Sequence, residues 1–242
     1  MSDPAQATGE EPRDGGDGRV PVIAIDGPSG AGKGTVARGV AEHLGFHLLD
    51  SGAVYRAAAL HAIRAGAPLD DEPAVLDAMA RLDVRFVPGP SGVRVFFGEE
   101  EVTGELRTES TAAGASRVAA MSGVRARLLP QQRSFRLAPG LVADGRDMGT
   151  VVFPDATLKV FLTASAETRA GRRAKQLKEK GIDATMRSLL EDIEARDRRD
   201  ATRTHSPLLA AEDALVIDSS DLAAEAVVAR VVEVFEEKSR PG

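Results

Sequence analysis

The chain has 242 residues, a formal net charge of −6 and no cysteine. That length fits one α/β domain with insertions, and the lack of cysteine excludes disulfides, thiol nucleophiles and cysteine metal sites. An acidic chain lacks the broad basic face that binds a nucleic-acid polymer. No apolar run approaches the roughly 18 residues that span a membrane, and the N-terminus does not resemble a signal peptide. We therefore expect a cytoplasmic protein with no membrane or nucleic-acid partner.

The first eighteen residues predict an acidic tail. Residues 1–18 carry five acids against one arginine and show no apolar periodicity. Such a segment cannot bury enough apolar surface to offset the entropy lost on ordering. We therefore predict a disordered tail over residues 1–18 and a folded domain over residues 19–242.

The next stretch predicts a phosphate-binding loop. An apolar run, Val20–Ile25, is long enough for a buried parallel strand, and the glycine-rich turn Gly27–Gly32 follows it. Lys33 then opens a helical pattern that Gly45 ends. Glycines let backbone N–H groups converge on phosphate oxygens, the helix N-terminus adds partial positive charge, and Lys33 adds a full one. The spacing of Gly27, Gly32 and Lys33 after a strand therefore predicts a P-loop.

One position departs from the common P-loop pattern. Gly34 stands where a serine or threonine usually follows the lysine, and Thr35 comes one residue later. This Gly-Lys-Gly-Thr order is similar to that of the nucleoside-monophosphate kinases. Thr35 is therefore the candidate for the magnesium side of the site, acting through a water molecule.

The rest of the chain alternates strands and helices around an insertion. Further core strands are predicted over Phe46–Leu49, Leu141–Asp144, Thr157–Leu162 and Ala214–Ile217. Helices are predicted over Ala53–Ala65, Asp70–Arg81, Thr108–Ala120, Gly123–Ala138, Glu167–Lys180, Ala184–Arg203 and Ala223–Lys238. Within residues 82–103, closely spaced β-rich runs predict a small antiparallel meander over Val84–Val87, Val93–Phe97 and Glu101–Thr103.

These elements predict an α/β fold of the three-layer P-loop type. It has a five-stranded parallel sheet, the antiparallel β insertion at 82–103 and a helical lid at about 167–203. Most charges of the lid fit a solvated pair of helices linked by ion pairs. The segment Arg196–Asp200 with Arg203 is denser in arginine than solubility requires.

Polar residues follow three of the predicted strands. They are Asp26–Gly27, Asp50–Ser51 and Asp144–Asp147, and the carboxyl ends of parallel strands share one edge, where ligands bind. Asp50 or Ser51 could equally serve only as the N-cap of the helix that follows. The three strand ends together predict a binding site at this edge.

The chain resembles the bacterial cytidylate (CMP/dCMP) kinases from about Val22 to about Val234. The strings that carry the resemblance are Ile25–Thr35, Leu49–Arg56, Leu82–Phe86, Ala115–Ala119, Asp144–Asp155 and Arg196–Asp200. The first string is common to many phosphate binders, whereas Leu49–Arg56 and Asp144–Asp155 are far more particular to this family.

The resemblance implies transfer of the γ-phosphoryl group of ATP to CMP or dCMP, with magnesium, by a P-loop kinase domain that we expect to be monomeric. It implies that cytosine is read by Ser116, Arg125 and Asp147, the acceptor phosphate is held by Arg56, Arg146 and Arg203, and the sugar is held by Arg196 and Asp200. Ser51 matches a nucleotide-contacting serine. The implied ATP-binding residues are Gly27, Pro28, Ser29, Gly30, Ala31, Gly32, Lys33, Gly34, Thr35, Arg172 and Arg173, and the implied catalytic residues are Lys33, Arg146, Arg196 and Arg203.

Two alternative functions stay open on the residues alone. A small kinase of the same architecture could take UMP, AMP or shikimate as its acceptor. A nucleotide-dependent switch would bind the nucleotide without transferring a phosphoryl group, but it gives no reason for an arginine-dense lid.

Overall fold

The computed structural model describes residues 19–87, 89, 93–179, 181–201 and 208–240. The predicted tail over residues 1–18 lies outside the described residues. Arg203, predicted to be catalytic and to bind CMP, lies outside them too. Both therefore remain predictions.

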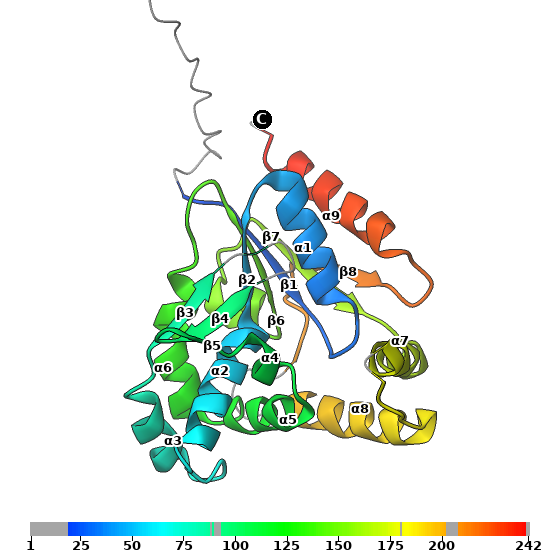
Figure 1. Ribbon diagram of the computed structural model, residues 1–242. Helices are drawn as coiled ribbons and strands as arrows, with labels where there is room; N and C mark the ends of the chain where they lie inside the picture. The colour runs from blue at the N-terminus through cyan, green and yellow to red at the C-terminus, as the bar shows by residue number, and fades with distance from the viewer. Residues whose placement is uncertain (1–18, 88, 90–92, 180, 202–207, 241–242) are drawn as a thin grey trace, which may run out of the picture.

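The predicted five-stranded parallel sheet is confirmed (Figure 1). Its strand order is β2-β6-β1-β7-β8, and every neighbouring pair runs parallel. The strands are β1 (Val22–Asp26), β2 (His47–Asp50), β6 (Leu141–Gly145), β7 (Leu158–Thr163) and β8 (Leu215–Asp218). The three strands that end in the predicted site residues, β1, β2 and β6, are thus neighbours.

The central strand β1 is buried on both faces of the sheet. Val22 and Ala24 pack into the core beneath α2, α3, α5 and α6, whereas Ile23 and Ile25 pack into the core beneath α1 and α9. Successive side chains of a strand point to opposite faces, so a continuous apolar run fits a strand covered on both sides. The covering helices are α1 (Lys33–Leu44), α2 (Ser51–Arg64), α3 (Glu72–Met79), α5 (Glu109–Val118), α6 (Ser122–Arg133) and α9 (Ala224–Lys238).

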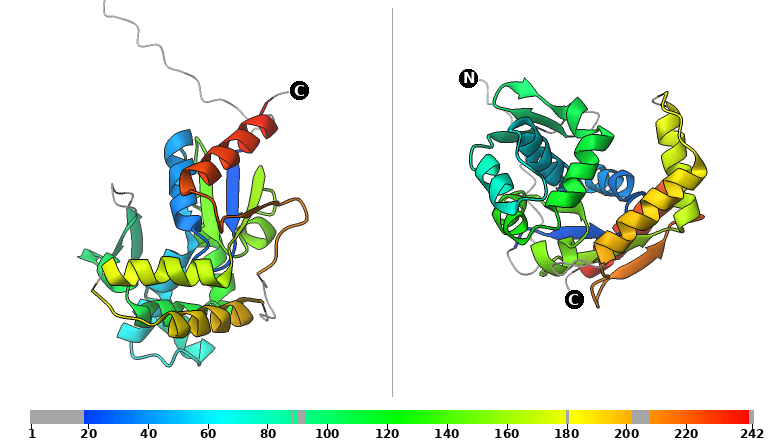
Figure 2. Two further views of the ribbon diagram at one scale, coloured as in Figure 1. Left: turned by 90° about the vertical axis from the view of Figure 1, so that its right-hand side faces the viewer. Right: turned by 90° about the horizontal axis from the view of Figure 1, so that it is seen from below.

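Two smaller parts flank the carboxyl edge of the sheet, as Figure 2 shows from below. One is the predicted antiparallel sheet, formed by β3 (Val84–Val87), β4 (Arg94–Phe97) and β5 (Glu100–Glu101), with the short helix α4 (Thr103–Leu106) after it. The other is the helix pair α7 (Ala166–Glu179) and α8 (Met186–Ala201), which has its own apolar contact centred on Ala170, Leu177, Leu189 and Ile193.

The structure departs from the sequence prediction most clearly at two places. The helix predicted over Gly123–Ala138 ends at Arg133, where the chain turns so that Phe135 packs edge-on against Phe86 at 5.7 Å between ring centroids. A π-helix, η1 (Met148–Val152), follows β6 and was not predicted, because so short a turn has no apolar period of its own.

Candidate active site

The loop between β1 and α1 has the geometry of a phosphate cradle. Gly27 has φ 148°, and a Cβ at that position would lie 1.9 Å from the carbonyl oxygen of Leu162. Gly32 has φ 94° directly before α1, whose first turn closes with Thr35 and Val36 donating to the Gly32 carbonyl. Only glycine fits these two positions, so the loop can wrap closely around an anion.

Lys33 lies at the centre of the site and is 6% exposed. Its Nζ donates to the carbonyl oxygen of Pro28 at 2.9 Å and lies 3.9 Å from Oδ1 of Asp144. Burial, and then the positive charge of Arg146, lower the pKa of Lys33 from its ordinary 10.5 to about 7. The nearby positive charge of Arg196 acts in the same direction, so α8 brings Arg196 close to the phosphate loop.

Two carboxylates lie at the ends of β2 and β6, and that of Asp144 faces this lysine. Burial raises the pKa of Asp144 to about 6, against the lowering effect of Lys33, and the negative charge of Asp50 raises it further. Asp50 caps α2 by accepting from the N–H of Ala53 at 2.9 Å, and it also accepts from Arg56 at 2.8 Å. Asp50 is thus both a helix cap, as one sequence interpretation held, and the partner of a predicted phosphate-binding arginine.

Two of the three predicted cytosine-binding residues, Arg125 of α6 and Asp147, contact each other. Arg125 donates to the buried carboxylate of Asp147 and lies 5.8 Å from the ring centroid of Tyr55. The hydroxyl of Ser116 is buried, with no hydrogen-bond partner among the described residues. A buried hydroxyl without a partner is costly unless a ligand supplies one, so Ser116 is suited to a polar ligand.

Two further predicted residues join the lid to the sheet. Arg146 donates from Nε to Oδ2 of Asp200 at 3.0 Å, and Asp200 is 1% exposed. Ser51, at the start of α2, is buried, and its Oγ lies close enough to Gly145 that a Cβ there would approach it to 2.8 Å. The ends of β2 and β6 and the last turn of α8 therefore meet at one place.

The two predicted ATP-binding arginines of α7 have different partners. Arg172 donates to the carbonyl oxygen of Ala31 in the phosphate loop at 3.2 Å and to the Ser219 carbonyl at 2.5 Å. Arg173 instead donates to Glu109, at the start of α5. Arg172 thus contacts the phosphate loop, whereas Arg173 links the lid to the helices on the opposite side of the site.

Two residues at this edge, Asp26 and Arg169, have roles that the sequence interpretation missed. Asp26, 5% exposed, accepts from the N–H groups of Met148 and Gly149 at 2.8 Å each. Burial raises the pKa of Asp26 to about 6, although these two hydrogen bonds lower it. Arg169 donates to Asp197 of α8 at 2.6 Å and to the Ser29 carbonyl at 3.3 Å, so it ties both lid helices to the phosphate loop. In the sequence, only the position of Asp26 at the end of a predicted strand indicated that it belongs to this edge.

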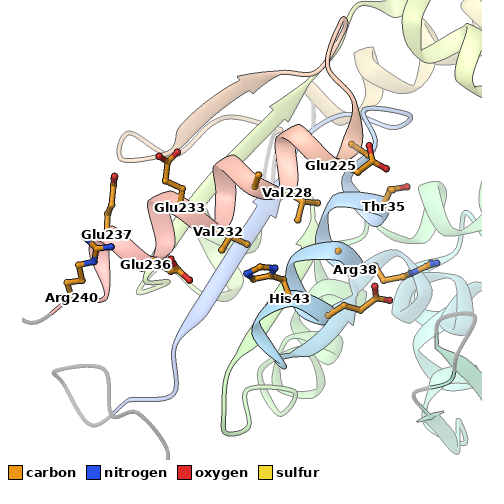
Figure 3. A pocket seen from close by; sticks show the side chains of 14 residues that line it. Thr35, Arg38, His43, Glu225, Val228, Val232, Glu233, Glu236, Glu237 and Arg240 are labelled. Atoms are coloured by element: carbon orange, nitrogen blue, oxygen red, sulfur yellow. The ribbon is translucent and has the colours of Figure 1, made fainter.

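Thr35, the predicted magnesium-side residue, is exposed and lines a different hollow of the surface. Figure 3 shows it at the start of α1, beside a groove of about 730 Å³ between α1 and α9. Gly34 lies nearer to the carboxylates, since a Cβ there would come 3.4 Å from Oδ2 of Asp144. The groove is rimmed by acidic side chains that would repel a triphosphate, among them Glu225, Glu233, Glu236 and Glu237. A separate cavity of about 90 Å³, lined in part by Gly34, Asp50, Arg56 and Asp144, adjoins the strand ends.

Comparison with known proteins identifies the family of the chain. The cytidylate kinase family profile matches residues 23–237. The chain belongs to the cytidylate kinase family. A cytidylate kinase of Pseudomonas aeruginosa (strain UCBPP-PA14) is 57% identical over 217 residues, covering 89% of this chain and 95% of that one. A cytidylate kinase of Photobacterium profundum is 54% identical over 217 residues, covering 90% of this chain and 95% of that one.

Among solved structures, the similarity is more distant. A gluconokinase from Sinorhizobium meliloti 1021 superposes with a TM-score of 0.46 at 15% identity, covering 90% of this chain and 93% of that one. No helix in the described part of the chain is both long and apolar enough to span a bilayer.

Proposed function

We propose that this cytidylate kinase binds ATP at the Gly27–Lys33 loop and CMP or dCMP between Arg56, Arg125 and Asp147. As a family member, it transfers a phosphoryl group from ATP to CMP. The observation that supports the residue assignment best is the convergence of Lys33, at the start of α1, with Asp144 and Arg146, from the end of β6. A phosphate donor and a phosphate acceptor could meet there.

The cytosine pocket is proposed from the pair of Asp147 and Arg125. A carboxylate accepts from the exocyclic amine of cytosine, while a guanidinium donates to the ring acceptors. Ser116 would supply its buried hydroxyl, which has no hydrogen-bond partner among the described residues. Uracil carries an oxygen where cytosine carries the amine, so the carboxylate would repel UMP.

Transfer is proposed to depend on positioning and charge neutralisation. Phosphoryl transfer passes through a loose, in-line transition state that asks for little covalent chemistry from the protein. Lys33 and Arg146 are placed to hold the transferred group, with Arg196 close to Lys33. Arg56 and Arg203 would clamp the acceptor phosphate, and Arg196 with Asp200 would hold the sugar hydroxyls. Planar guanidinium groups suit phosphate oxygens better than the point charge of lysine.

Magnesium is proposed as the cofactor, and the donors at the strand ends fit it. Mg²⁺ prefers oxygen ligands and is often held by one or two carboxylates together with substrate phosphates and water. Asp144 and Asp50 supply such carboxylates beside Gly34, which adds no side chain to the space. Among the described residues, no three acidic or histidine side chains form a closed metal site, which suits an ion that keeps several waters. Bound there, the ion would neutralise charge on the phosphates, and Thr35 would reach it only through water.

The lid is proposed to complete the ATP site and to exclude water. Arg172 already contacts the phosphate loop, and Arg173 would leave Glu109 to reach the ATP phosphates. Closure of α7 and α8 over bound nucleotides limits hydrolysis of ATP. Because the proposed site takes its groups from one chain, we also propose a monomer, acting in the cytoplasm as one kinase domain over residues 19–242, with its β insertion at 82–103 and its lid at about 167–203.

The assignment can be tested with a coupled assay of ADP release, using CMP, dCMP, UMP and AMP as acceptors. We expect kcat/KM for CMP and dCMP to exceed that for UMP and AMP. Asp147→Asn should lower kcat/KM for CMP by roughly 10- to 100-fold, the loss expected for one charged hydrogen bond. It should also reduce the ratio of kcat/KM for CMP to kcat/KM for UMP. Arg117→Gln, an exposed arginine on the same helix as Ser116, is the control. An unchanged CMP preference in Asp147→Asn would contradict the proposed pocket.

A further inference from the structure

The π-helix η1 is capped from a distant part of the chain. Its first two N–H groups, on Met148 and Gly149, lie too early in the turn to have partners inside it. Each donates to one carboxylate oxygen of Asp26 at 2.8 Å. Asp26 is 122 residues away from Met148 in the chain and ends β1, immediately before the phosphate loop.

The residue that would ordinarily cap this turn is Asp147. Aspartate is among the preferred N-cap residues because its carboxylate accepts from the first free N–H groups of a helix. Asp147 occupies the N-cap position of η1, yet its side chain makes no capping hydrogen bond. Its carboxylate receives Arg125 instead. At the start of η1, Asp26 therefore accepts from the free N–H groups, and Asp147 accepts from Arg125.

We infer that Asp26 is a positioning residue for cytosine recognition: by capping η1 from the end of β1, it keeps the carboxylate of Asp147 free to face the base. This inference rests on the proposed role of Asp147 in the cytosine pocket. Without the cap, the free N–H groups of Met148 and Gly149 compete with Arg125 and with the base for the Asp147 carboxylate. An unsatisfied buried N–H is costly, so Asp147 turns back onto η1.

The consequence is that Asp26 variants should behave like Asp147 variants. Asp26→Ala removes both acceptors of the cap. We expect kcat/KM for CMP to fall about 10- to 100-fold and the ratio of kcat/KM for CMP to kcat/KM for UMP to decrease. Asp26→Asn retains one acceptor and nearly the native volume, so we expect an intermediate loss, and it keeps the test open if Asp26→Ala does not fold. KM for ATP should rise less than KM for CMP, because both variants remove a negative charge near Lys33 but the two hydrogen bonds that they disturb go to η1.

The decisive experiment is a double-mutant cycle read out as acceptor preference. If Asp26 acts through Asp147, then adding Asp26→Asn to Asp147→Asn causes no further loss of CMP preference over UMP. Val232→Ala, a buried change in α9 far from η1, is the stability control and should leave that preference unaltered.

The outcomes separate the two proposals. Full additivity of the two changes, or an equal rise in KM for ATP and CMP in the Asp26 variants, would overturn the inference while leaving the cytosine pocket in place. An Asp147→Asn variant with unaltered CMP preference would remove the proposed pocket, and the role of Asp26 with it. Loss of preference in Val232→Ala would reduce the Asp26 effect to general destabilisation and would also overturn the inference.

Discussion

The buried lysine of the phosphate loop should take up a proton when ATP binds. The pKa of Lys33 is lowered to about 7, chiefly by burial, whereas an ordinary lysine has a pKa of 10.5. A triphosphate in contact with Nζ favours the charged form and raises this pKa again. The proton needed for that change comes from the buffer.

The magnitude follows from the pKa at pH 8. With a pKa of about 7, roughly one-tenth of Lys33 is protonated at pH 8, so full protonation on binding takes up about 0.9 proton. Asp26 and Asp144, each with a pKa of about 6, are already almost fully ionised at this pH and contribute little. The terminal phosphate of ATP is also ionised, since the second pKa of a phosphate monoester is about 6.

Isothermal titration calorimetry can measure this uptake. ATP is titrated at pH 8 in two buffers of different ionisation enthalpy, with a chelator present so that no metal binding contributes, and the difference in heat gives the number of protons. Lys33→Arg is the matched control, because a guanidinium is always protonated and should take up none. Equal heats in the two buffers for the wild-type protein would refute the argument that burial holds Lys33 partly neutral.

Three further predictions use the same site. Lys33→Ala should lower kcat about 10²-fold or more in a steady-state assay, because it removes a preorganised charge from the transferred group, and near-wild-type turnover would contradict this role. The raised pKa of Asp144, about 6 against an ordinary 3.8, means that the stability it contributes is full below about pH 3.8 and is lost as the pH rises through about 6. Asp144→Asn should therefore flatten the decline of Tm between about pH 4 and pH 6.5 in scanning calorimetry, and an unaltered slope would show that Asp144 titrates normally. Glu109→Gln should lower KM for ATP about twofold or more, because it releases Arg173. The stability lost should be less than about 1 kcal/mol, since the ion pair is partly exposed. Arg173→Gln should raise KM for ATP. If neither variant alters KM for ATP, then Arg173 does not bind ATP.

The phosphate loop and the sheet edge could be predicted from sequence because their signals are local. A buried strand, a glycine turn and a helix follow one another within about 25 residues, so Gly27, Gly32 and Lys33 need no distant contact to be recognised. The convergence of Asp50 and Asp144 followed from a general rule, that ligands bind where parallel strands end.

The partners of the charged residues could not be predicted, because they depend on tertiary contacts. Asp26 and Met148 are 122 residues apart, and nothing near Asp26 in the sequence indicates that it caps η1. Arg173 lies on a charged helix whose pattern does not indicate that Glu109 is its partner. The early end of α6 has the same cause, since helical periodicity continues past Arg133 while Phe135 packs on the β insertion.

The ion pairs of this edge have one physical reason in common. Several arginines at the carboxyl edge are held by a carboxylate on another element or a turn away: Arg56 by Asp50, Arg125 by Asp147, Arg146 by Asp200 and Arg169 by Asp197. Burying a guanidinium without a hydrogen-bond partner costs free energy. A guanidinium whose partner is flexible would have no fixed orientation. Because arginine has five donors in a fixed plane, one edge can keep its carboxylate while another edge receives a phosphate oxygen. On the proposed assignment, the carboxylates orient the arginines rather than compete with the nucleotide, so an acidic chain would still present a positive pocket to a polyanion.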